Sequence, residues 1–181
     1  MEYTKSGNGE NAKLIVASIG TATDTDLIIP AHAQFEGETL PVKGFEEAFR
    51  QNMSITSVVI PKGFTSISQA VFMECKKLVS VVFPDSLTAI DSMAFSGWVL
   101  LTSITLPDTI ETIGVRVFEN CSGLITFTVP ENVALIESDA FDGATHLIEV
   151  YNKSSPDITA IHVSAENKSY LSMECFTIKR A

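Results

Sequence analysis

The sequence predicts a β-rich repeat solenoid, a coil in which short parallel strands and tight turns recur along one axis. The first observation is a phenylalanine that recurs at intervals of 23 residues. The second is an apolar residue followed by proline, which recurs at the same interval. Several residue types in phase at one period are typical of solenoid proteins. The phenylalanines are Phe49, Phe72, Phe95, Phe118 and Phe141, and the pairs are Ile60-Pro61, Phe83-Pro84, Leu106-Pro107 and Val129-Pro130.

Residues 1–44 come before the regular repeat, and we expect them to form an N-terminal cap. The apolar run over residues 13–19 predicts a strand. The stretch from proline to phenylalanine spans 19 residues in the first coil and 11 in the second, so the first coil carries an insertion of eight residues around residues 31–37. A solenoid exposes its core at each end, so a capping segment is expected here.

Residues 45–152 contain five repeats of 23 residues. In the unit that begins at Leu101, Ile104 and Leu106 alternate with Ser103 and Thr105, which is the period-two pattern of a strand with one buried face. Proline ends each such strand, because it cannot donate to a ladder. We therefore expect strands that pair in parallel as a single sheet near residues 57–60, 80–83, 103–106, 126–129 and 148–151.

The second half of each unit predicts a shorter extended segment and then a tight turn. In the same unit, Ile110 and Ile113 mark the extended segment, and Val117 to Cys121 form one helical or 3₁₀ turn. Identical positions of successive coils stack at the strand spacing of about 4.8 Å. The five periodic phenylalanines should therefore form a continuous buried stack.

The repeat loses its phase after Val150. Residues 153–181 contain strand-like segments at 158–163 and 176–178. We expect them to be either a C-terminal cap or the start of a truncated continuation of the solenoid.

The pattern Leu-x-x-Ile-x-Leu-Pro-x-x-Ile-x-x-Ile-Gly-x-x-Val-Phe-x-x-Cys resembles the BspA-type class of leucine-rich repeat, found in secreted and surface proteins of bacteria and some protists. The resemblance covers residues 45–152, with lead-ins at residues 27–30 and 37–42. It implies a leucine-rich-repeat-like right-handed coil, capped at both ends. It also implies a secreted or cell-surface location and an adhesin-like role without catalysis.

Trp98 and Ala144 depart from this pattern, because they stand where Cys75 and Cys121 stand in other coils. A tryptophan in a position that normally packs a thiol should push its coil outward or turn to the surface.

The cysteines do not suggest a disulfide or a catalytic thiol. Cys75 and Cys121 lie two coils apart, which places their Cα atoms about 9 to 10 Å from each other, beyond the roughly 7 Å that a disulfide tolerates. No histidine shares a repeat position with either. We expect both to be reduced, buried and inert.

Metal and cofactor sites are also not expected. The histidines show no metal-ligand spacing, and the acidic clusters lack the six-ligand loop of a calcium site. Phosphate-binding glycine loops and nucleophile elbows are absent from the sequence. The residues considered are His32, His146 and His162, and the acidic clusters at 24–26, 36–38, 46–47 and 139–142.

The charge of the chain limits the class of partner. Lys and Arg number 12 against 22 for Asp and Glu, which gives a net charge of −10. A nucleic-acid ligand is therefore not expected. No apolar run approaches the roughly 20 residues that span a bilayer, so membrane insertion is not expected either. We expect a monomer whose partner is neutral, cationic or apolar.

The outward side chains of the strands form the candidate binding face, because five coils present equivalent positions there in one strip. We expect this face to recognise a protein or glycan. The alternative is a structural spacer or stalk in a larger surface protein, because small Ser, Thr and Val also suit any exposed sheet. The candidate residues are Ser57, Val59, Ser80, Val82, Ser103, Thr105, Thr126, Thr128 and Tyr151, with Glu149 beside them.

Overall fold

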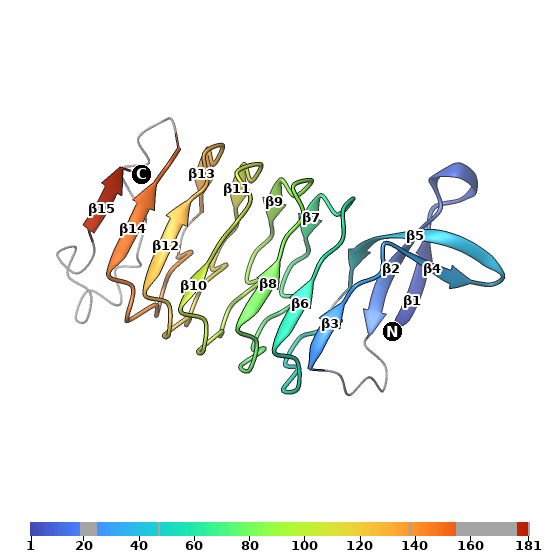
Figure 1. Cartoon of the computed structure of the whole chain (residues 1–181), viewed down its shortest axis with the longest axis horizontal. Coiled ribbons are helices and arrows are strands. Elements are labelled where there is room, and N and C mark those ends of the chain that lie inside the picture. The colour runs from blue at the N-terminus through green and yellow to red at the C-terminus, as the bar shows by residue number, and fades with distance from the viewer. Residues whose placement is uncertain (19–24, 47, 138, 155–176, 181) are drawn as a thin grey trace.

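Short parallel strands stack into an elongated β-solenoid in the computed structural model (Figure 1). The structure describes residues 1–18, 25–46, 48–137, 139–154 and 177–180. One long side of the coil is a row of strands that we call the strand row: β3 (Asp26–Ile28), β6 (Ser57–Val59), β8 (Ser80–Val82), β10 (Ser103–Ile104), β12 (Thr126–Val129), β14 (Glu149–Asn152) and β15 (Thr177–Arg180).

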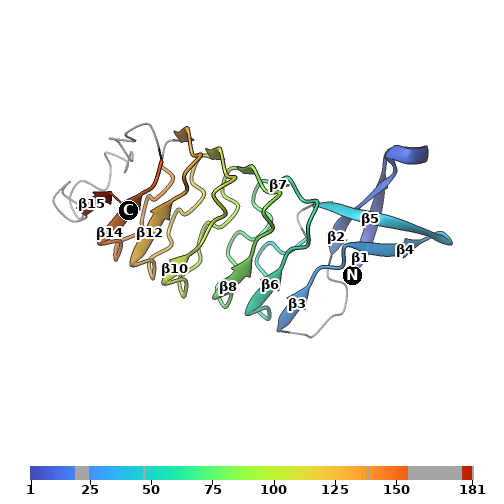
Figure 2. The same cartoon turned by 45° about the horizontal axis from the view of Figure 1, so that its top comes forward.

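A second row of two-residue strands runs along another side of the coil (Figure 2). These strands correspond to the shorter extended segment predicted in each unit, and they pair in parallel throughout. They are β7 (Ser66–Ile67), β9 (Ala89–Ile90), β11 (Thr112–Ile113) and β13 (Leu135–Ile136).

The prediction of one continuous sheet in the strand row is wrong. The row consists of two sheets, β3-β6-β8 and β10-β12-β14-β15, with no ladder between β8 and β10. The amide of Val79 donates to Thr56 O at 2.9 Å, and that of Ile125 donates to Thr102 O at 2.9 Å. Among the described residues, the equivalent bond from Thr102 to Val79 is missing.

We attribute the interruption to the bulk of Trp98. It precedes β10 and is fully buried, so it does not turn to the surface as one of the two expectations had it. Its ring lies 4.7 Å from that of Phe95 and 6.1 Å from that of Phe72, in space that a thiol occupies in other coils. The larger side chain holds its coil away from the preceding strand. In the next coil, Gly123 allows close approach again, since a Cβ there would clash with the carbonyl oxygen of Val99.

The core is the predicted stack of phenylalanine rings. All five rings are buried, with at most 1% of each residue exposed. Successive centroids lie 5.0, 6.0, 5.7 and 5.3 Å apart in stacked orientations. The prediction of a continuous buried stack is confirmed, and it accounts for much of the phenylalanine content of the chain.

The turn around each phenylalanine is a series of 3₁₀-type bonds rather than a helix. In one coil, the amides of Glu119, Cys121 and Leu124 each donate to a carbonyl three residues earlier. Residues two before and two after the phenylalanine have a positive φ in coil after coil, between 54° and 82°. Only two of these positions are glycine, so the turn is held by packing rather than by glycine. They are Ala70, Met93, Arg116 and Asp139 before the ring, and Gln51, Glu74, Gly97, Asn120 and Gly143 after it.

The N-terminal segment adds a sheet of a different kind. Its order is β1-β2-β5-β4, formed by β1 (Glu2–Ser6), β2 (Lys13–Ser18), β4 (His32–Phe35) and β5 (Glu38–Phe45), with the 3₁₀ turn η1 (Gly9–Asn11) between the first two. The insertion around residues 31–37 supplies β4 and the turn of a projecting hairpin, and β4 pairs antiparallel with β5 (Figure 1). β3 instead pairs in parallel with β6, so the strand row reaches back into residues 26–28.

The end of the chain continues the strand row. β15 pairs in parallel with β14, from Glu149 opposite Thr177 to Asn152 opposite Arg180. The strand-like segment at 158–163 lies outside the described residues.

Candidate functional site

The strands of the strand row expose two ranks of side chains to solvent, which we call the outward face. The strands turn their middle residue towards the core: Val58, Phe127 and Val150 are at most 1% exposed, and Val81 of β8 is half-buried. The residues on either side of that middle position therefore point away from the core. The structure places all nine candidate residues on this face. Ser80, Ser103, Thr105, Val59 and Val82 are exposed, and Ser57, Thr126, Thr128 and Tyr151 are half-buried.

The rank nearer the strand starts is polar. Register pairs Asp26 with Ser57 and Ser57 with Ser80, and pairs Ser103 with Thr126 and Thr126 with Glu149. The Ser57 hydroxyl donates to Asp26 Oδ1 at 2.7 Å. This rank is thus a line of hydroxyls with a carboxylate at each end.

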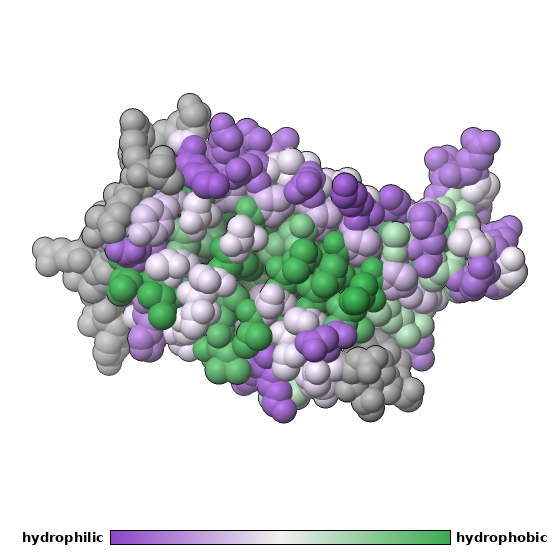
Figure 3. Space-filling model, viewed as in Figure 1, coloured by the Kyte–Doolittle hydropathy of each residue, from purple (hydrophilic) through white to green (hydrophobic). Residues whose placement is uncertain are grey.

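The second rank changes character along the solenoid. Ile28, Val59 and Val82 are aligned on β3, β6 and β8 and are 72%, 36% and 54% exposed. The equivalent residues in the next two coils are Thr105, which directly follows β10, and Thr128 on β12. We call Ile28, Val59 and Val82 the aliphatic sector, and Figure 3 shows apolar surface gathered over that part of the row.

Ile28 and Asp26 were missed by the sequence reasoning, which assigned residues 1–44 to a cap. A signal was present, because Leu27-Ile28-Ile29-Pro30 carries the same alternation and terminal proline as the later strands. The long insertion that follows obscured the 23-residue phase at this point.

Tyr151 is the aromatic residue among the nine candidates, and it is half-buried. Its hydroxyl donates to Glu149 Oε2 at 2.6 Å. This contact orients the phenol ring along the strand at the far end of the row from the aliphatic sector.

The buried thiols are unsuited to catalysis. Cys75 and Cys121 are free and fully buried, as predicted, and their Sγ atoms donate to Phe49 O at 2.9 Å and Phe95 O at 3.2 Å. Burial raises the pKa of each thiol to about 12, so the nucleophilic thiolate does not form near neutral pH.

The histidines and carboxylates of the described residues do not converge on a metal site. No group of three or more His, Cys, Asp or Glu side chains is placed there to hold an ion. His32 and His146 are exposed, and His162 lies outside the described part.

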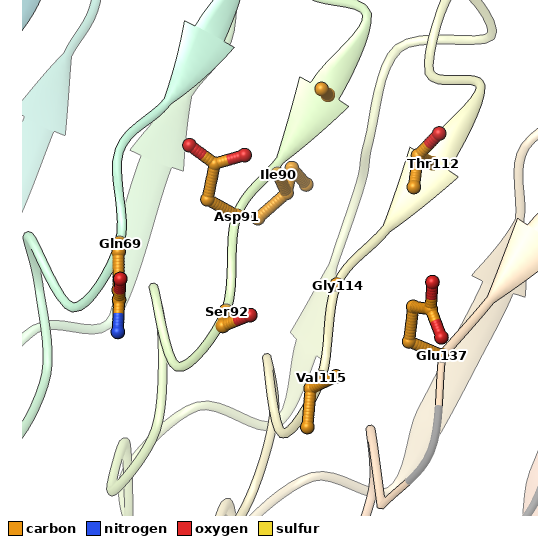
Figure 4. A pocket seen from close by; sticks show the side chains of 9 residues that line it. Gln69, Ile90, Asp91, Ser92, Thr112, Gly114, Val115 and Glu137 are labelled. Carbon is orange, nitrogen blue, oxygen red and sulfur yellow. The ribbon is translucent and has the colours of Figure 1, made fainter.

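A shallow hollow of about 310 Å³ lies beside the second row (Figure 4). Asp91, Thr112 and Glu137 line it, and Gly114 forms its floor because a Cβ there would lie 2.9 Å from Ser92 N. Burial raises the pKa of Asp91 somewhat. Ser92 also lines the hollow, and in the described part of the chain neither its hydroxyl nor that of Thr112 is hydrogen-bonded to Asp91 or Glu137.

Comparison with known proteins identifies the class of repeat. The family model described as BspA type leucine rich repeat region matches residues 45–176 in six copies. No curated protein matches the chain. In the described residues, no helix has the length and apolar character that crossing a membrane requires.

Solved structures share the coil. A leucine-rich repeat protein of T. pallidum is 28% identical with a TM-score of 0.72, over 82% of this chain and 68% of that one. One from Bacteroides ovatus is 24% identical with a TM-score of 0.70, over 83% and 46%. A leucine rich cell surface protein of Faecalibacterium prausnitzii is 20% identical with a TM-score of 0.52, over 84% and 53%. The chain spans about half the length of the last two.

Proposed function

Because this chain belongs to the family of BspA-type leucine-rich repeat proteins, we propose that it is a non-catalytic binding module of a secreted or cell-surface protein. Its outward face would recognise a protein or glycan partner in the manner of an adhesin. One similar structure is described as a cell surface protein, which supports the location. Fold alone does not imply function, so the proposal rests on the surface itself.

The observation that carries the proposal is the exposed aliphatic sector. Ile28, Val59 and Val82 occupy neighbouring strands in register, on a face where small hydroxyl residues suffice in the following coils. Aligned, exposed aliphatic side chains on one face are typical of an interaction site.

The spacer or stalk remains the second candidate, and one observation favours it. Binding hot spots are enriched in Trp, Tyr and Arg, and among the nine candidate residues only Tyr151 is of these types.

The test places arginine at Val82, the last residue of β8, and at Thr105, which directly follows β10 on the other side of the ladder break. Binding to a partner captured from the natural surroundings of the protein should be abolished, with little change in the thermal midpoint. Thr88→Arg with Ala134→Arg is the matched control, since both residues are exposed near the second row. Unchanged affinity in the first variant would move the site elsewhere, and failure to recover any partner would favour the spacer.

A further inference from the structure

The outward face meets two different electrostatic environments along the solenoid. Residues 43–77 contain five Lys and Arg against three Asp and Glu. Residues 78–152 contain ten Asp and Glu against a single Arg. That arginine, Arg116, lies 3.7 Å from both Glu119 and Asp139. The later coils are therefore strongly acidic, and the aliphatic sector extends from β3, which precedes residues 43–77, to Val82, which lies in the first of these acidic coils.

Three carboxylates of the acidic part stand at the edge of the outward face. Asp85, Asp108 and Glu131 follow the prolines that end the strands of three successive coils, and all three are exposed. We call them the acidic rim. Figure 3 shows hydrophilic surface along the edge where these strands end.

Few Lys or Arg side chains lie near the outward face, and most of them lie away from the acidic rim. Lys153 lies 3.4 Å from Asp108 Oδ1, but both side chains are about half exposed, so this ion pair is weak. Lys62 occupies the equivalent position one coil before the rim. Lys76 and Lys77 lie beyond the opposite ends of the strands, where Lys76 is paired with Glu74 at 3.0 Å.

We propose that the aliphatic sector and the acidic rim together bind an extended segment of a protein partner, with aliphatic side chains at one end and Lys or Arg at the other. This inference rests on the proposed function and specifies the partner. From β3 to β12 there are four strand steps, or about 19 Å, which an extended segment of about six residues spans. Aliphatic contacts supply the affinity, and the rim sets the orientation and speeds association.

The same surface disfavours the other occupants. Tyr151, the aromatic residue of the candidate set, has its hydroxyl bonded to Glu149, so the face lacks a row of aromatic platforms for sugar rings. A second copy of this chain would bring another net charge of −10 to the acidic coils.

The test uses a fluorescein-labelled octapeptide with leucine and valine in its first half and arginine and lysine in its second half, measured by fluorescence anisotropy at low and physiological salt. Val59→Thr with Val82→Thr should weaken binding roughly tenfold at both salt concentrations. Threonine is already present at the equivalent positions 105 and 128, so this variant should fold. Asp85→Asn with Glu131→Gln should weaken binding at low salt and flatten its salt dependence.

The controls are a peptide with glutamate in place of the basic residues and the variant Leu135→Thr. Leu135 is 47% exposed on the second row, so Leu135→Thr should bind the octapeptide normally. The inference would be overturned if the glutamate peptide bound as tightly as the basic octapeptide. It would also be overturned if Leu135→Thr weakened binding as much as Val59→Thr with Val82→Thr, or if the octapeptide did not bind at all. So would a glycan array or sedimentation showing that a glycan or a second copy occupies the sector. If Val82→Arg with Thr105→Arg still abolished binding of the natural partner, the proposed function would stand without this inference.

Discussion

At the residue scale, the position three residues after each stacked phenylalanine carries a buried hydrogen-bond donor in three consecutive coils. Cys75, Trp98 and Cys121 each donate to the carbonyl oxygen of the phenylalanine one coil earlier. The indole N–H of Trp98 makes this bond at 2.7 Å. The position therefore accepts an indole as well as a thiol, because both can donate to this carbonyl. Ala144 fills the same position one coil later without a side-chain donor, so the bond is favourable but not required.

Replacing Phe118 by alanine should destabilise the protein by about 3 to 5 kcal/mol, because the change removes buried area and leaves a cavity in the middle of the stack. The ring lies 5.7 Å from that of Phe95 and 5.3 Å from that of Phe141. Urea unfolding measures the change, with Phe35→Ala in the half-buried hairpin as the milder control. Equal unfolding midpoints in Phe118→Ala and the parent would show that the stack is not the core.

Stability should fall as the pH rises from 9 towards 12. Burial raises the pKa of Cys75 and Cys121 from 9.0 to about 12, so the folded state favours the neutral thiols. Their contribution is complete below pH 9 and is lost as pH rises to about 12, by up to about 1.4 kcal/mol per pH unit for each thiol. Unfolding midpoints measured across this range should fall less steeply in Cys75→Ala with Cys121→Ala. Prompt labelling of both cysteines in the native protein at pH 8 would contradict their burial.

At the element scale, the two long sides of the coil differ in continuity. The ladder of the second row passes from β7 to β13 without a break. The strand row is interrupted between β8 and β10, above the buried Trp98. The bulk of Trp98 in the core therefore accompanies a loss of backbone pairing between β8 and β10, while the second row stays paired. The interruption lies directly beside Val82, at one end of the aliphatic sector.

The amide of Thr102 should exchange with solvent faster than those of Val79 and Ile125. The latter two donate across the strand row at 2.9 Å, whereas Thr102 lacks the equivalent bond among the described residues. Native-state hydrogen exchange followed by NMR measures the three rates in one sample. Equal protection of all three amides would show that the ladder is closed in solution.

At the scale of the whole molecule, negative charge is concentrated in one part of the solenoid. The acidic coils at 78–152 carry nearly all of the net charge of −10. Exposed carboxylates of successive coils are separated by only one or two strand steps, within the screening length of about 8 Å at physiological salt for adjacent coils. Their mutual repulsion opposes the stacking of the same coils that the phenylalanines stabilise.

Added sodium chloride should raise the thermal midpoint, because it screens this repulsion. Replacing Glu137 by lysine should reduce the effect, since it places a cation between neighbouring acidic coils. Scanning calorimetry over a salt series measures both slopes. A midpoint that is independent of salt, or that falls with it, would contradict the account.

Most of the fold could be predicted from the 23-residue period of the sequence. The phenylalanines and prolines recur in phase, so the parallel strands, the second row and the buried thiols followed from the sequence alone. Periodicity fails where a coil departs from the pattern. The insertion at residues 31–37 separated the lead-in at residues 27–30 from the 23-residue phase, so Ile28 was not assigned to the outward face although the local alternation was recognised.

The coil, its stack and the side chains that face outward could be predicted, because they depend on spacing along the chain. How neighbouring coils meet could be seen only in the folded molecule. The sequence left open whether Trp98 would stay buried and where its volume would be accommodated, since that depends on the space between two coils rather than on either one. The same holds for the alignment of Ile28 with Val59 and Val82, which lie 31 and 23 residues apart in sequence and become neighbours only through strand pairing.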